Sequence, residues 1–278
     1  MRKFLLAMTL SLLGCHAAGA ADSGVVDLVN RKVLRVCADP ANLPYSNEKG
    51  EGFENKIASV IADELKVPIE YTWYPNSTGF VKMTLFSKRC DLIVGSAQGD
   101  DQMLNSNAYY RSTYALITRK GSGLEAVNSL GDPLLKDKRI GIIANTPPGL
   151  LMVRHGLMVK AKPYPLVKDP RYMNPQADMI KDIRSGEIDA GILWGPYAGY
   201  FAKSEGEPLV VTPLSGDPEV STKMTYGMTL GVRLSDTDWK KQLNAVLVKR
   251  RADIDKVLLD FGIPVLDDQD KPITAPRS

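Results

Sequence analysis

The chain has 278 residues, of which 44% are hydrophobic and 24% are charged, and its formal net charge is +3. A chain of this size can bury one large core or two modest ones, and its composition excludes a disordered tail, a collagen-like repeat and a small disulfide-dense scaffold. The 35 Lys and Arg residues nearly balance the 32 Asp and Glu residues, so no strong positive field favours nucleic acid.

The first twenty residues have the pattern of a secretory signal peptide. Arg2 and Lys3 precede an apolar run at 4–13, which is too short to span a bilayer comfortably, and the small residues at 18–20 offer a cleavage site. We therefore expect residues 1–20 to be removed and the product to be periplasmic, without a membrane span. Lipidation at Cys15 is the alternative.

Few residues of the expected product suit catalysis or metal binding. It keeps one histidine, His155, and two cysteines, Cys37 and Cys90. A Ser–His–Asp or Cys–His site would need His155, which lies in an apolar stretch with no cysteine or second histidine nearby. The sequence holds no Cys-x-x-Cys pair and no phosphate-binding glycine loop. We expect no catalytic residue, metal or cofactor.

The first part of the chain predicts alternating strands and helices. Apolar or alternating runs predict strands at 33–38, 69–74 and 91–95. A period of four residues predicts a helix at 53–65, and a second helix fits 77–88. In that second helix the residues expected to face inward are Phe80, Met83 or Thr84, and Phe86. Strand, helix, strand, helix, strand makes a parallel sheet with right-handed crossovers.

The same alternation recurs further along the chain. Strands are predicted at 139–143, 188–194 and 209–212. We expect Thr146 to cap one helix, and Asn174 to begin another that Gly186 ends. An extended segment follows at 224–232, and then a helix begins near a capping sequence at 235–238. The sequence thus predicts two α/β lobes.

The order of several short motifs resembles the family 3 solute-binding proteins. The motifs are residues 34–40 with Pro44-Tyr45, Gly-Phe-Glu-Asn at 52–55, Ala-Tyr-Tyr at 108–110, residues 185–190, and residues 251–256 with Gly-Ile-Pro at 262–264. The resemblance implies an α/β fold of the type II periplasmic-binding-protein class, with two lobes joined by two crossing hinge strands near 113–119 and 224–232. It places lobe one at 21–118 and 227–265 and lobe two at 119–226, with a loose tail at 266–278.

Further motifs are similar to one branch of that family, the J proteins of methanol-oxidation gene clusters. They are residues 36–44, 50–58, 70–73, 89–91 and 109–114, and Gly-Pro at 195–196. This resemblance implies a non-catalytic periplasmic partner that assists maturation or activation of a pyrroloquinoline-quinone-dependent methanol dehydrogenase, by binding a segment of it in the interlobe cleft. The implied partner is that enzyme, alone or with its cytochrome c, and the chain by itself is expected to be monomeric. The alternative is an importer's solute-binding subunit for a small neutral or aromatic molecule.

The sequence departs from the amino-acid-binding members of the family. Those members hold the ligand carboxylate with an arginine after the third strand, and the ligand ammonium with an aspartate after the second-lobe strand. Here the stretch 96–103 has no arginine and 192–197 has no acid, which argues against a free amino acid as ligand. The candidate cleft residues that remain are Asp39, Asn42, Tyr45, Ser96, Gln98, Tyr110, Arg111, Asn145, Thr146, Trp194 and Tyr197.

An enzyme on the same scaffold is a third hypothesis. It would need a desolvated acid or base in the cleft, and Asp39 and Glu54 are the candidates.

The two cysteines leave two outcomes open. An oxidising compartment favours a Cys37–Cys90 disulfide. The predicted strands place these residues at opposite ends of parallel neighbours, roughly 10 Å apart at 3.3 Å per residue. A disulfide needs Cα atoms within about 7 Å.

Overall fold

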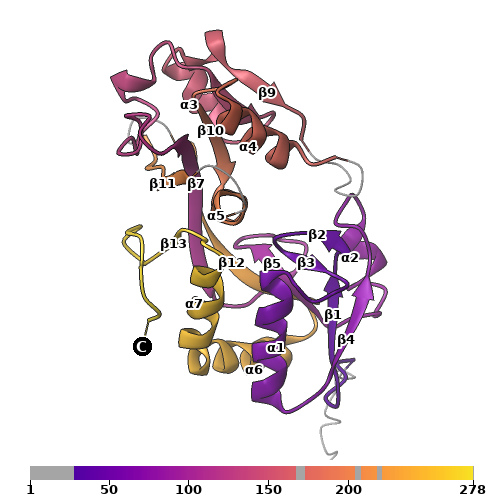
Figure 1. Ribbon diagram of the computed structural model, residues 1–278. Helices are drawn as coiled ribbons and strands as arrows, with labels where there is room; N and C mark the ends of the chain where they lie inside the picture. Colours follow the sequence, from indigo (N-terminus) through magenta and orange to yellow (C-terminus); the bar gives the residue numbers. More distant parts are fainter. Residues whose placement is uncertain (1–27, 167–172, 204–207, 218–220, 278) are drawn as a thin grey trace, which may run out of the picture.

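The computed structural model describes residues 28–166, 173–203, 208–217 and 221–277, and in it the chain forms two lobes (Figure 1). The predicted signal peptide and Cys15 lie outside these residues. Lobe one, the lower part of Figure 1, contains the N-terminal strands and the C-terminal helices. Lobe two, the upper part, is built from the middle of the chain. No helix within the described ranges has the length and apolar character needed to cross a membrane.

The sheet of lobe one confirms the three strands predicted there. Strands β1 (Leu34–Ala38), β4 (Ile69–Trp73) and β5 (Leu92–Ala97) are parallel, with Val36 opposite Tyr71 on one side and Leu92 on the other. Strand β12 (Thr225–Val232) runs antiparallel beside β5, and the short β6 (Leu104–Asn105) pairs with β12. A hairpin of β2 (Ala41–Asn42) and β3 (Ser46–Asn47) rises from the end of β1.

Lobe two repeats the arrangement. Strands β8 (Ile140–Ile143), β9 (Lys162–Tyr164) and β10 (Ala190–Trp194) are parallel, with β8 in the middle. The long strand β7 (Tyr110–Arg119) pairs antiparallel with β10 and with β11 (Leu209–Pro213).

Strand β7 joins the lobes. Its residues up to Thr113 pair with β12 of lobe one, and from Tyr114 on it pairs with β10 and β11. The prediction of two α/β lobes implies a separate sheet in each, but the hydrogen-bonded ladder is continuous, because one strand serves both lobes. The pairing changes lobes shortly before the expected boundary at 118. The hydrophobic cores are nevertheless separate, one around Phe53 and Ile57 in lobe one and others around β8 and β10 in lobe two.

Helices cover the sheets as the periodicity predicts. Lobe one carries α1 (Phe53–Leu65), α6 (Thr237–Lys249) and α7 (Arg251–Asp260). Lobe two carries α3 (Pro148–Arg154), α4 (Pro175–Ser185), α5 (Gly195–Ala202) and the 3-10 helices η1 (Pro133–Leu135) and η2 (Leu157–Lys160). The Asn174 side chain accepts a hydrogen bond from the Ala177 amide at the start of α4, and Gly186 ends that helix in a left-handed conformation, as expected.

Two local predictions were wrong. The helix predicted at 77–88 is only one turn, α2 (Phe80–Met83), because the chain then turns under the sheet and buries Thr84 and Leu85 while Met83 and Phe86 stay exposed. Thr146 does not cap α3. Its hydroxyl donates to the Ile143 carbonyl instead, and the helix begins after Pro147.

The C-terminal segment is held in place, contrary to the expectation of a loose tail. Strand β13 (Val265–Leu266) pairs with β7, and Ile273 hydrogen-bonds back to Val265. The Arg277 guanidinium forms a 2.6 Å ion pair with the fully buried Asp255 carboxylate of α7. A buried carboxylate needs such a partner, and here it comes from a distant part of the chain that no local pattern connects to α7.

Cys37 and Cys90 form a disulfide, with Cα atoms 5.4 Å apart. The predicted distance between the two Cα atoms was too long because Cys90 does not lie in a strand. It precedes β5 at a point where the Arg89 carbonyl accepts a hydrogen bond from Thr72 of β4. Cys90 therefore lies against the face of the sheet that Phe80 and Leu85 cover, within reach of Cys37.

Candidate ligand and partner cleft

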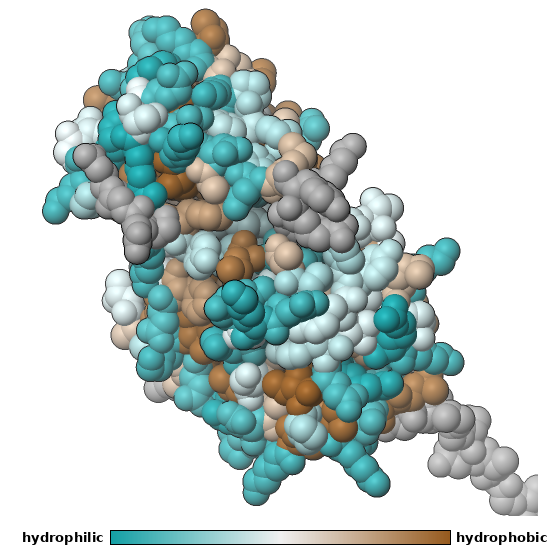
Figure 2. All heavy atoms as spheres, turned by 45° about the vertical axis from the view of Figure 1, so that its right-hand side comes forward, coloured by the Kyte–Doolittle hydropathy of each residue, from teal (hydrophilic) through white to brown (hydrophobic). Residues whose placement is uncertain are grey.

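Two cavities meet at the junction of the lobes, and both include Asn42 and Tyr197 in their lining. The interlobe cavity has a volume of about 470 Å³ and lies between the β2–β3 hairpin and the helices α4 and α5. The lobe-one cavity has a volume of about 380 Å³ and lies over the carboxyl ends of β1 and β5. On the face shown in Figure 2, hydrophilic residues dominate, and hydrophobic ones gather at the waist between the lobes and at the lower end.

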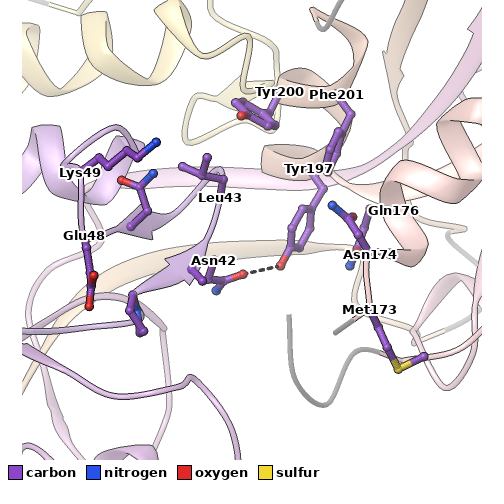
Figure 3. Close-up of a pocket in the computed structure, with 13 residues that line it drawn as sticks. Asn42, Leu43, Glu48, Lys49, Met173, Asn174, Gln176, Tyr197, Tyr200 and Phe201 are labelled. Carbon is purple, nitrogen blue, oxygen red and sulfur yellow. Dashed lines mark hydrogen bonds between the residues drawn. The ribbon is translucent and has the colours of Figure 1, made fainter. Parts of the chain in front are cut away.

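The interlobe cavity is lined by amides and aromatic rings. Figure 3 shows Tyr197 reaching from α5 towards Asn42 of the hairpin, and its hydroxyl donates to the Asn42 side-chain oxygen at 3.4 Å. The other polar groups are the amides Asn47, Asn174 and Gln176 and the side chains Glu48 and Lys49. The Asn47 amide already exchanges hydrogen bonds with Glu51, and the Asn174 oxygen accepts from the Ala177 amide. The amides of Asn42 and Gln176 are therefore the ones that can pair with the backbone of an extended chain.

Close packing fixes α5 and hence Tyr197. A Cβ at Gly195 would meet the Ser112 hydroxyl of β7, and one at Gly199 would meet the Gly262 carbonyl that follows α7. Glycine at both positions lets α5 lie directly against its neighbours. The Tyr197 ring then sits edge-on to Tyr45 at 5.1 Å.

The lobe-one cavity is acidic. Asp39, Glu54 and Asp100 line it, and none of its described lining residues is basic. Both oxygens of Asp39 are already occupied, because they accept hydrogen bonds from the backbone amides of Ala41 and Asn76. The Ser96 hydroxyl is buried and has no hydrogen-bond partner among the described residues.

Glu54 lies in the first turn of α1, and its carboxyl fits against an irregularity in β5. The pairing of β5 with β12 shifts register at Gly95, which has a φ of +88°. A Cβ at Gly95 would collide with the Glu54 carboxyl, so only glycine leaves room for that group. Burial, and then the nearby Asp39 charge, raises the pKa of Glu54 well above its ordinary value. The cavity therefore favours a protonated Glu54 or a cationic group beside it.

The structure brings five of the predicted cleft residues together around the lobe-one cavity: Asp39, Asn42, Tyr45, Ser96 and Tyr197. Asn145 and Thr146 instead line a separate groove beside α3.

The other four predicted residues line neither cavity. Tyr110 is buried in the lobe-one core, and Gln98 is exposed beside Gly227 of β12. Arg111 forms a 2.6 Å ion pair with Asp270. Trp194 packs edge-on against Tyr114 and Tyr226. Sequence order places these residues near strand ends, but the facing of each side chain depends on the register of β7 and β10.

Sequence reasoning missed the aromatic face of α5. Tyr200 and Phe201 line the interlobe cavity together with Tyr197. Their spacing of three and four residues is that of one helical face, so it is the signal that could have found them. The sequence marks Glu54 only as a candidate acid or base, and the bulge at Gly95 that leaves room for its carboxyl has no sequence signature.

The described residues contain no group of three or more His, Cys, Asp or Glu side chains arranged to hold a metal ion.

The sequence profile of the bacterial extracellular solute-binding proteins, family 3, matches residues 34–258. The chain belongs to this family. It is similar to Protein MoxJ of Methylorubrum extorquens, with 31% identity over 84% of this chain and 81% of that protein. It is also similar to Protein MoxJ of Paracoccus denitrificans, with 27% identity over 91% of this chain and 95% of that protein. The crystal structure of the periplasmic binding protein XoxJ from Methylobacterium extorquens AM1 superposes with a TM-score of 0.71, at 44% identity over 84% of this chain and all of that one.

Proposed function

We propose that this protein assists the maturation or activation of a periplasmic, pyrroloquinoline-quinone-dependent methanol dehydrogenase by holding a segment of that enzyme in the interlobe cavity. The similarity to MoxJ and XoxJ proteins supports the partner. Export through a cleaved signal peptide at residues 1–20 belongs to the same proposal.

The lining of the interlobe cavity is the observation that carries the segment-binding mechanism. Its amides come from both lobes, Asn42 and Asn47 from the hairpin and Asn174 and Gln176 from α4 and its cap. The rings of Tyr197, Tyr200 and Phe201 stand beside them. Amides that pair with a backbone, next to aromatic surface for its side chains, suit an extended peptide. Neither cavity has an arginine in its described lining to receive the carboxylate of a free amino acid.

The test has two measurements. Calorimetry measures binding of the mature chain to the purified dehydrogenase in its apo and holo forms, and an activity assay measures the rate at which the apo enzyme gains activity. Tyr197→Ala and Tyr200→Ala should each weaken binding by about tenfold or more, as loss of a central aromatic contact does. Phe86→Ala is the matched control, because Phe86 is an exposed aromatic that lines neither cavity. Thermal melts of each variant separate lost contact from lost folding. Equal binding by all variants would contradict the proposal.

A second candidate is the solute-binding subunit of an importer, and the lobe-one cavity favours it. Glu54 and Ser96 offer a small solute a carboxyl and an unused hydroxyl, beside the ring of Tyr45. These groups suit a small organic molecule with a donor or cationic group. A thermal-shift screen of small amines and aromatic alcohols distinguishes the candidates. A saturating solute should stabilise the mature chain in the absence of any dehydrogenase, by about 4 kcal/mol at a thousandfold excess over Kd.

A further inference from the structure

Lobe two carries a groove of about 770 Å³ beside α3, separate from the two cavities of the cleft. Helices α3 and η2 line one wall, and the segment that leads into β12 lines the other. Figure 1 shows α3 in the upper lobe, whereas the hairpin of the interlobe cavity belongs to the lower one.

The wall formed by the two helices is apolar and exposed. Leu150 is 65% exposed, Val153 64% and Met158 42%, and the adjoining Val159 is 90% exposed. Leu150 and Val153 are three residues apart on α3 and so lie on one face of it. We call these four residues the α3 patch. Contiguous exposed apolar side chains of this size usually mark an interaction site.

The charges around the α3 patch are mostly positive. Lys223 lines the opposite wall, with its ammonium 4.8 Å from the Tyr226 ring centroid, and it has no carboxylate partner among the described residues. Arg154 and Lys160 adjoin the patch. They contact Asp217 and Asp137, yet their side chains remain 44% and 48% exposed.

We propose that this groove docks a helical segment of a protein partner that presents apolar side chains on one face and carboxylates beside them. The apolar wall would bury the hydrophobic face, and Lys223 would pair with a flanking carboxylate. A hollow between two walls fits a rod-like segment better than the flat surface of a membrane. The inference concerns a different surface from the proposed function and does not depend on it.

Two designed peptides of about 18 residues test the chemistry of the occupant directly. Both carry Leu at one helical face, and their polar positions are Glu in one peptide and Lys in the other. Fluorescence anisotropy at low salt with the mature chain should show the Glu peptide binding at least about tenfold more tightly. The double variant Leu150→Ser/Val153→Ser should weaken that binding by about tenfold or more, and Lys223→Glu should weaken it by about threefold or more.

Val248→Ser and Lys241→Glu are the matched controls, because Val248 is 74% exposed and the Lys241 side chain 78% exposed on α6 of lobe one. Neither should change the affinity. Equal affinity for the two peptides, or affinity that survives the double variant, would overturn the proposal. The proposal would also be overturned if the chain bound phosphatidylglycerol vesicles and showed no preference between the two peptides, because the patch would then bind a membrane surface. A third outcome would also overturn the proposal: neither peptide binds, the chain dimerises, and the double variant abolishes the dimer. The α3 patch would then bind a second copy of the chain.

Discussion

At the residue scale, the feature with the clearest chemical consequence is Glu54. Gly95 leaves room for the Glu54 carboxyl, and burial next to Asp39 raises the pKa of that carboxyl. A carboxylic acid whose pKa is higher in the folded than in the unfolded state binds its proton more tightly when folded. Its contribution to stability is therefore full below the ordinary Glu pKa of 4.5 and is lost as the pH rises towards the raised folded value.

Replacing Glu54 with Gln should remove this pH dependence. We expect the free energy of unfolding of the wild type to fall, relative to that of Glu54→Gln, by at most about 1.4 kcal/mol per pH unit as the pH rises above the ordinary Glu value. Urea titrations at several pH values measure the difference. Glu70→Gln is the control, because Glu70 is exposed on β4. Parallel pH profiles for the wild type and Glu54→Gln would show that the carboxyl is not desolvated.

At the element scale, two links in lobe one each join a regular element to a segment outside the strands and helices. The Cys37–Cys90 disulfide ties β1 to the turn before β5, and Arg277 ties the C-terminal segment to α7.

Removing the disulfide should destabilise the protein without unfolding the sheet. The bridge spans a sequence separation of 53, for which the chain-entropy model gives about 4 kcal/mol. Cys37→Ala/Cys90→Ala should lower the free energy of unfolding by about that amount, measured by denaturant titration. Thiol counting on the unfolded wild type without reductant should find none at these positions, and two free thiols would refute the bridge.

The Arg277–Asp255 ion pair should stabilise the fold, although Arg277 lies near the C-terminal end of the chain. Arg277→Ala leaves the fully buried Asp255 carboxylate without its guanidinium partner, which costs about 3 kcal/mol at a typical buried pair. The exposed Lys271 gives the control substitution Lys271→Ala, which should change little. If both variants melt at the wild-type temperature, the C-terminal segment contributes nothing to the fold.

At the scale of the whole molecule, neither cavity at the junction of the lobes has an arginine in its described lining to bind the carboxylate of a free amino acid. Arg111, the first arginine after β5 in the sequence, is paired with Asp270 instead. The strand end where an acid would be needed carries Trp194, packed between Tyr114 and Tyr226.

Free amino acids should therefore not stabilise the protein. A ligand at a thousandfold excess over its Kd adds about 4 kcal/mol, which a thermal-shift assay detects easily. We expect no shift with any of the common L-amino acids, with L-arginine as the most demanding test because the lobe-one cavity is acidic. A clear, saturable shift with any of them would mean that another side chain replaces the missing arginine.

The sequence by itself determined the two α/β lobes, which follow from local periodicity, as in Phe53, Ile57 and Ile61 of α1. The crossing segments and the missing amino-acid anchors were what the resemblance to family 3 proteins implied. Only the tertiary structure decided which polar side chains meet. Side-chain facing depends on strand register, which left Tyr110 in the core, and on bulges such as the one at Gly95, which leaves room for the Glu54 carboxyl. It also decided the disulfide and the anchored C-terminus, because contacts between residues far apart in the chain leave no periodic trace in the sequence.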